Sequence, residues 1–139
     1  MEDWGIGTSR AHEFGVSHQA DELAERMHRF SIRVVGLCGK LPATPEGFAV
    51  RRQLVKAGTG VTANYRAARR ARSHAEFTAR MGVTSEEADE AVFWLRLTID
   101  SSLLTGSEVQ ELRTEAQEIS AICSAAYRTA RSKDRQHRR

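Results

Sequence analysis

The chain has few residues that interrupt or cross-link a polypeptide. It contains two prolines, two cysteines and 6% aromatic residues in 139 residues. The prolines, Pro42 and Pro45, lie almost together, and no segment alternates polar and β-branched residues as strands do. These absences exclude a disulfide-stapled or β-rich domain and predict an all-α protein of a single domain.

Hydrophobic segments suited to export or membrane insertion are also missing. No stretch approaches the roughly 20 apolar residues of a membrane span, and Met1–Gln19 lacks the apolar centre of a signal peptide. Cys38 and Cys123 occupy apolar positions in separate segments, which predicts buried thiols rather than a disulfide. We therefore expect a soluble cytoplasmic protein with no membrane partner.

Motifs for catalysis, cofactors and metals are absent or misplaced. No nucleophile elbow, phosphate-binding loop or Cys-x-x-Cys occurs. A di-iron bundle needs two Glu-x-x-His motifs, and this chain has one, Glu25–His28, with His28 on the outer side of its predicted helix. Gly58-x-Gly60-x-x-Ala63 is similar to a dinucleotide fingerprint, but it lies within a predicted helix whose amides are already bonded. We expect a non-enzymatic protein with no catalytic residue, cofactor or metal.

The carboxylates in residues 86–90 are interpreted as a solvated or inter-subunit face. Only Glu87 lies at the edge of the apolar stripe, where Asn64 or Tyr65 offers it a polar contact. An enzyme with an unrecognised site would have to use these three side chains together.

Apolar residues recur every 3.5 residues over most of the chain, which predicts packed helices. The repeat covers four segments, at about residues 20–41, 45–71, 73–104 and 107–131. Because the connections between them are short, neighbouring helices should be antiparallel. The sequence thus predicts an up-down-up-down four-helix bundle over residues 20–131, a flexible arm over 1–19 and a basic tail over 132–139.

Two glycines, Gly58 and Gly60, fall inside the second predicted helix, where each costs about 1 kcal/mol relative to alanine. Either the helix bends at these glycines, or they allow a neighbouring helix to approach closely. We favour close packing, because the apolar period keeps its phase from Leu54 to Val61.

The most unusual segment is Arg51–Arg72, which carries seven Lys or Arg residues and no Asp or Glu. At 100° per residue its apolar residues form one stripe, and the opposite side carries Arg52, Lys56, Arg66 and Arg70. This cationic row spans about 27 Å at a rise of 1.5 Å per residue. Because unpaired cations repel one another, we expect an acidic partner to cover the row.

Two kinds of partner fit this face. Spaced cations suit the phosphates of a nucleic acid, and no aromatic series interleaves with them, which favours backbone or shape recognition over base stacking. The predicted contacts, with RNA as the expected ligand, are Arg51, Arg52, Lys56, Arg66, Arg69 and Arg70. In the alternative, the protein is a structural oligomer whose basic face pairs with Glu108, Glu111 and Glu115 of a neighbouring subunit. We favour the nucleic acid.

Two segments carry a resemblance to a known family. They are Gly58–Arg66, which reads GTGVTANYR, and Glu87–Glu90, which reads EADE and is followed by Trp94-Leu95. Together with the rest of Leu23–Ala130, they resemble the four-helix bundle proteins first described as encoded by 23S rRNA intervening sequences. The superfamily to which those proteins belong also includes the accessory variability determinant of diversity-generating retroelements.

The resemblance implies a ring, typically a homopentamer, formed by four-helix bundles. It also implies that basic surfaces bind nucleic acid and, in the retroelement members, a reverse transcriptase. On this chain the implied binding surface corresponds to Arg52, Lys56, Arg66, Arg69 and Arg70.

Overall fold

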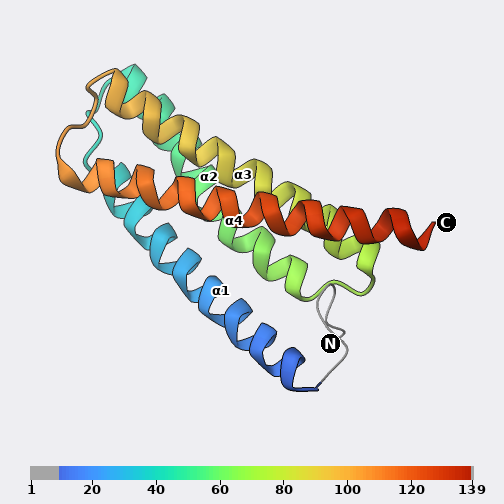
Figure 1. Ribbon diagram of the computed structural model, residues 1–139. Helices are drawn as coiled ribbons and strands as arrows, with labels where there is room; N and C mark the ends of the chain where they lie inside the picture. Colours follow the sequence, from blue (N-terminus) through green and yellow to red (C-terminus); the bar gives the residue numbers. More distant parts are fainter. Residues whose placement is uncertain (1–9, 139) are drawn as a thin grey trace.

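The computed structural model describes residues 10–138, without the side chains of residues 10–17 and 137. Four helices make up this part of the chain: α1 Arg10–Cys38, α2 Pro45–Arg69, α3 His74–Asp100 and α4 Ser107–His137. They run up and down in turn (Figure 1). Each helix packs against the next one in the sequence, and α1 also contacts α4. The predicted all-α, antiparallel four-helix bundle is confirmed.

The first and last helices, α1 and α4, are longer than the sequence pattern predicts. Helix α1 begins at Arg10, so residues 10–19, assigned above to the arm, are helical; the rest of that arm, residues 1–9, lies outside the described residues. Helix α4 continues to His137, through most of the segment 132–139 that was predicted to be a basic tail outside the bundle. The apolar repeat marks only the packed part of a helix, so it does not predict where a helix ends.

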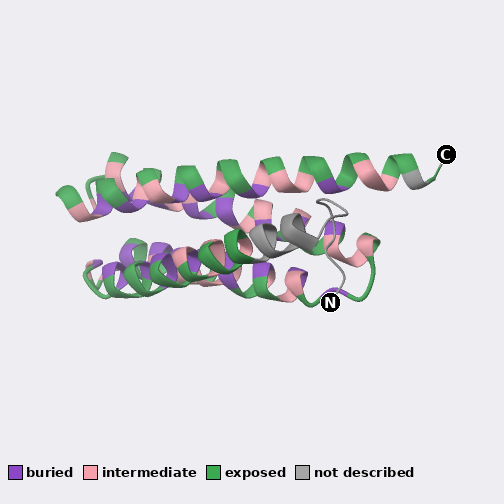
Figure 2. Cartoon of the chain, turned by 60° about the horizontal axis from the view of Figure 1, so that its bottom comes forward, coloured by how far each residue is buried: buried purple, intermediate pink, exposed green. Residues whose placement is uncertain are grey.

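The core lies along the axis between the four helices, as the buried stripes in Figure 2 show. Its largest fully covered side chains come from all four helices: Met27, Phe30, Leu54, Met81, Leu95, Leu112 and Ile119. Contacts are most extensive where α3 meets α2 and α4, and least extensive between α1 and α4. The α1/α4 seam is therefore the least extensive of the four contacts between helices.

Side-chain caps mark the start of α2 and, after the next turn, the start of α3. The Thr44 hydroxyl accepts a hydrogen bond from the Gly47 amide at 3.1 Å, and Pro45 occupies the first turn. After the turn, the Ser73 hydroxyl accepts from the Glu76 amide at 3.0 Å and begins α3. These caps fix where α2 and α3 begin.

Gly58 and Gly60 in the interior of α2 lie in close contact with neighbouring helices. A Cβ on Gly58 would lie 2.6 Å from Val34 Cγ1 of α1, and one on Gly60 would lie 2.9 Å from Glu87 Oε2 of α3. The Ser31 hydroxyl also donates to the Gly58 carbonyl at 2.7 Å. Helix α2 remains helical through both glycines. The prediction of close packing, rather than a bend, is confirmed.

Both cysteines are buried and unbridged, as predicted. Burial raises the pKa of Cys38 to about 11 and that of Cys123 to about 12, so both are protonated at neutral pH. Within residues 10–138, no helix combines the length and apolar character needed to cross a membrane.

We expect Gly58→Ala to destabilise the protein, although alanine favours a helix by about 1 kcal/mol. The added methyl must displace the buried, β-branched Val34, and overpacking of this kind costs about 1–3 kcal/mol. Urea unfolding followed by circular dichroism measures the difference. The matched control is Gly36→Ala on α1, where a Cβ would meet nothing within 4 Å and the variant should be more stable than the parent. Equal stabilisation by both changes would contradict the close contact.

Candidate nucleic-acid interface

The outer side of α2 carries the predicted cationic row. Arg52, Lys56, Arg66 and Arg70 are all exposed, on the side opposite the buried residues of the helix. Within the described part of the chain, none of these four side chains has a hydrogen bond or an ion pair. The helix therefore presents four positive charges that the bundle itself does not neutralise.

Two predicted contacts have other roles in the structure. Arg51 donates from Nε to the Cys38 carbonyl at 3.0 Å and from Nη2 to the Leu41 carbonyl at 2.9 Å. These carbonyls lie at and just beyond the end of α1, so Arg51 satisfies acceptors that the helix leaves open. Arg69 forms an ion pair with Asp21 of α1, with 2.6 Å between Nη2 and Oδ1. Neither arginine is as free to bind an external anion as the four of the row.

The α1/α4 seam is lined by ion pairs within the same chain. Lys40 Nζ lies 2.6 Å from Glu108 Oε2, and Arg33 Nη2 lies 3.0 Å from Glu111 Oε2. Further along the seam, Arg26 Nε donates to Glu115 at 2.9 Å, and its Nη2 bonds both Glu115 and Glu118. We call these contacts the α1/α4 ion-pair ladder. Hydrogen bonding to Arg26 lowers the pKa of the Glu115 carboxyl below its usual range.

The ladder bears directly on the alternative interpretation of the basic face. That interpretation pairs the face with Glu108, Glu111 and Glu115 of a neighbouring subunit. In the structure each of these three carboxylates already pairs with a cation of its own chain, on α1 or just beyond its end. These carboxylates of α4 thus have cationic partners within the chain, whereas the α2 row forms no ion pair in the described residues.

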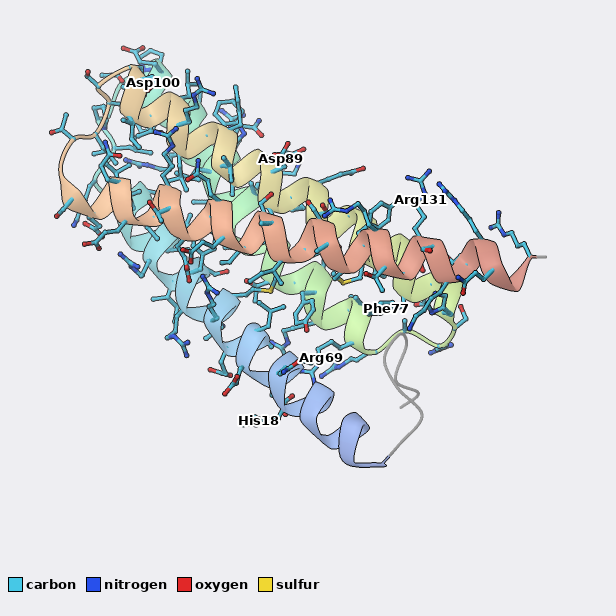
Figure 3. All side chains as sticks on the ribbon, in the orientation of Figure 1. His18, Arg69, Phe77, Asp89, Asp100 and Arg131 are labelled. Atoms are coloured by element: carbon cyan, nitrogen blue, oxygen red, sulfur yellow. The ribbon has the colours of Figure 1, made fainter. Side chains whose placement is uncertain are left out.

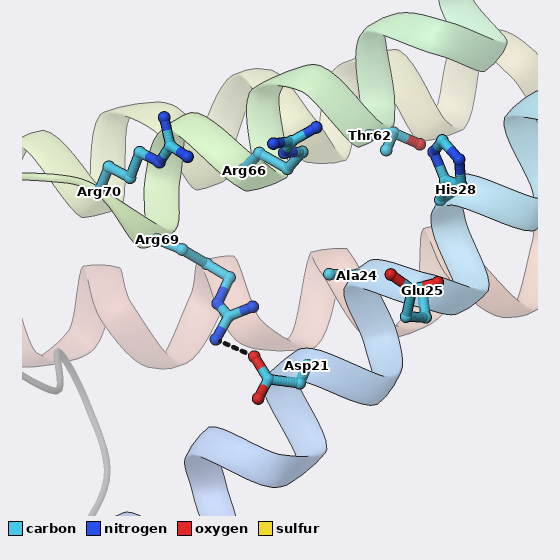
Figure 4. A pocket seen from close by; sticks show the side chains of 8 residues that line it. All are labelled: Asp21, Ala24, Glu25, His28, Thr62, Arg66, Arg69 and Arg70. Carbon is cyan, nitrogen blue, oxygen red and sulfur yellow. Dashed lines mark hydrogen bonds and ion pairs between the residues drawn. The ribbon is translucent and has the colours of Figure 1, made fainter.

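Two open depressions flank the C-terminal half of α2. The first lies between α1 and α2 and is shown in Figure 4; its charged lining is Asp21 and Glu25 of α1 and Arg66, Arg69 and Arg70 at the end of α2, with His28 beside them. In that view Arg69 reaches across to Asp21. As predicted, His28 is exposed on the outside of α1. We call this the α1/α2 depression; its arginines share it with two carboxylates.

The second depression lies between α2 and α3 and has a different charge balance. It is lined by Ala63, Arg66, Ala67, Arg70, Arg72, Glu76 and Arg80. We call it the α2/α3 depression. Arg80 was not among the predicted contacts, because it lies on α3, after the basic segment ends; the antiparallel packing of α2 and α3 brings it into the same depression as Arg66 and Arg70.

The polar residues proposed for an unrecognised catalytic site do not meet. Asn64 donates to the Gly60 carbonyl at 2.8 Å, and the Tyr65 hydroxyl donates to the Ala20 carbonyl at 3.5 Å. Glu87 Oε2 is buried against Gly60 without a hydrogen-bond partner, and burial raises the pKa of the Glu87 carboxyl. The nearby Lys56 acts in the opposite direction on this pKa. No group of three or more potential metal ligands occurs among the described residues.

Comparisons with known proteins agree with the bundle. The sequence pattern of the family described as 23S rRNA-intervening sequence protein matches residues 20–125. A crystal structure of a protein of unknown function from the S23 ribosomal protein family of Bacteroides thetaiotaomicron VPI-5482 is similar, with a TM-score of 0.69 and 26% sequence identity. The similarity covers 76% of this chain and 97% of that one. No curated protein is significantly similar.

We expect the Arg26–Glu115 pair of the ladder to stabilise the protein in a pH-dependent way. Because the folded pKa of Glu115 is lowered, its contribution is complete above the unfolded carboxyl pKa of about 4.3 and is lost as the pH falls through the folded value. Glu115→Gln should therefore lower stability at neutral pH by about 1 kcal/mol. Urea unfolding of both proteins should show this difference shrinking in acid.

The matched control for this prediction is Glu111→Gln. Glu111 is 65% exposed in its pair with Arg33, against 23% for Glu115, so its removal should cost less. A Glu115→Gln penalty that is the same at every pH would show that the carboxylate charge does not stabilise the seam.

Proposed function

We propose that the chain, which belongs to the 23S rRNA-intervening sequence protein family, binds the phosphate backbone of nucleic acid and catalyses no reaction. RNA is the expected ligand. The proposed contacts are the exposed cations Arg52, Lys56, Arg66 and Arg70 of α2. We further propose that it acts as an oligomer of identical subunits.

One observation carries the proposal. Carboxylates of α4 pair with Arg26 and Arg33 of α1 and with Lys40 just beyond it, whereas the cationic row of α2 is exposed and forms no ion pair within the described residues. Exposed like charges on one helix destabilise it, so their presence favours a polyanionic partner. Nucleic acid supplies negative charges at regular spacing along a surface as long as the row.

The surroundings of the row favour recognition of the backbone rather than of bases. Of the aromatic residues of α2, Tyr65 is buried, with 7% of its surface exposed, and Phe48 is 48% exposed, but the Arg51 guanidinium lies over its ring, 5.4 Å from the centroid. Stacking of unpaired bases requires exposed aromatic faces, whereas guanidinium groups bind phosphate oxygens through paired N–H donors. A folded RNA, with its phosphates on the outside, suits this arrangement better than a single strand.

Exposed apolar residues on two separate helices support self-association. On α1, Ile32 and Val35 are 58% and 51% exposed; on α3, Phe93 and Leu97 are 54% and 38% exposed. A ring of more than two subunits requires two different complementary surfaces on each subunit. We propose that these two surfaces meet between neighbouring copies. The resemblance described above suggests five copies, and it suggests a reverse transcriptase as a protein partner.

We expect binding to a structured RNA to weaken steeply as salt increases. Four phosphate contacts predict a slope of about −4 in a plot of log K against log salt concentration. The double change Arg66→Gln with Arg70→Gln should reduce this slope by about 2, measured by fluorescence anisotropy. The control, with the same loss of charge, is Arg33→Gln with Lys40→Gln in the ladder. Binding that does not depend on salt would contradict the proposal.

We expect Phe93→Asp to disrupt the oligomer, because it places a charge in a surface proposed to be buried between copies. Size-exclusion chromatography with light scattering should show a shift to smaller species. Arg66→Glu with Arg70→Glu should leave the oligomer intact and abolish RNA binding. If this charge reversal instead dissociates the oligomer, the basic face pairs with a neighbouring subunit and the alternative function is correct.

A further inference from the structure

The antiparallel fold concentrates positive charge at one end of the bundle. The end of α2, the start of α3 and the last turns of α4 lie together there, and His74 of α3 contacts the Ala130 carbonyl of α4 at 3.0 Å. In Figure 3, Arg131 lies toward this end and Asp100 at the opposite one. A polyanion approaching the bundle is therefore attracted most strongly to this end.

The α2/α3 depression lies at this end and has the chemistry of a phosphate site. Four arginines, Arg66, Arg70, Arg72 and Arg80, line it with a single carboxylate, Glu76, which leaves a local excess of three positive charges. Glu76 also accepts a hydrogen bond from the Arg72 amide at 3.0 Å, so it serves the turn between the helices. Because the other lining residues are alanines, a phosphate group can approach the helix closely.

The rest of the cationic row has less favourable surroundings. Near the middle of the row, Lys56 interacts electrostatically with the half-buried Glu87 of α3, which carries two further carboxylates close by, Glu86 and Glu90. Arg52 lies a further turn away, about 21 Å from Arg66 at 1.5 Å per residue. On the other flank, the α1/α2 depression contains Asp21 and Glu25. These carboxylates would repel a phosphate, and the α2/α3 depression is the side with the largest cationic excess.

We propose that the backbone of a double-helical nucleic acid is anchored in the α2/α3 depression, where Arg66, Arg70 and Arg80 hold its phosphates and Arg72 contacts them from the turn. This inference rests on the proposed function and places the main contact elsewhere. The duplex crosses from α2 to α3 at one end of the bundle instead of following α2 along its length. Arg80 is then a binding residue, and Arg52 and Lys56 are peripheral. No aromatic side chain lines the depression, which agrees with a duplex rather than unstacked bases.

The test compares two arginines of the same helix. Arg80→Gln and Arg96→Gln each remove one charge from an exposed position of α3, but Arg96 is paired with Asp100 at the far end. With the full chain and an RNA duplex of about 20 base pairs at low salt, Arg80→Gln should weaken binding about five- to tenfold and reduce the salt slope by about 1. Arg96→Gln should bind as the parent does.

Further variants separate this inference from the proposed function. Arg52→Gln and Lys56→Gln should each weaken binding less than Arg80→Gln; the reverse order would overturn the anchoring site while leaving the function intact. Failure of the parent protein to bind the duplex at low salt would overturn the function itself. Arg80→Lys keeps the charge without the planar donor pair and should bind between the parent and Arg80→Gln, provided that circular dichroism shows it to be folded.

Two further ligands test whether the depression binds a duplex. A single-stranded RNA of the same length should bind more weakly than the duplex; equal or tighter binding would contradict the duplex assignment. Inorganic phosphate at millimolar concentration should compete no better than sulfate at matched ionic strength. Selective competition by phosphate would show a site for a small anion in place of a nucleic acid backbone.

Discussion

The rotation of α2 about its own axis determines which of its residues reach solvent, and two close contacts fix that rotation. Gly58 lies against Val34 on one side, and Gly60 lies against Glu87 on the other. With both flanks held at short range, the helix cannot turn without a clash, since interiors are close-packed. The exposed positions of Arg52, Lys56, Arg66 and Arg70 follow from these contacts. A residue with a side chain at Gly58 would separate α1 from α2 and loosen that constraint.

Cations and carboxylates are paired along the α1/α4 seam of the bundle, whereas between α2 and α3 the cations are in excess. The α1/α4 ion-pair ladder joins cations of α1 to carboxylates of α4 along the seam with the least helix contact. Around α2 and the start of α3, arginines outnumber carboxylates in the α2/α3 depression. Surface ion pairs contribute only about 0–1 kcal/mol each, so the ladder matters chiefly because it occupies the α4 carboxylates. The basic surface of α2 is left for a partner outside the chain.

Sequence reasoning predicted the fold well, because heptads, caps and short loops all indicate the same bundle. It also placed Arg66 and Arg70 on the solvent side of α2, since the helical period alone decides that. It missed the bonds of Arg51 to the Cys38 and Leu41 carbonyls, which depend on how the first loop turns back. Arg80 was missed for the same kind of reason: its position beside α2 is a property of tertiary packing and not of its own segment.

The most direct test of the basic surface is arginine protection in the complex. The protein is treated with an arginine-selective dicarbonyl reagent, with and without a structured RNA, and the modified residues are identified by mass spectrometry. The account predicts that RNA protects Arg66, Arg70 and Arg80 and leaves Arg33 and Arg96 as reactive as before. Protection that is uniform over all five, or restricted to Arg33 and Arg96, would contradict it.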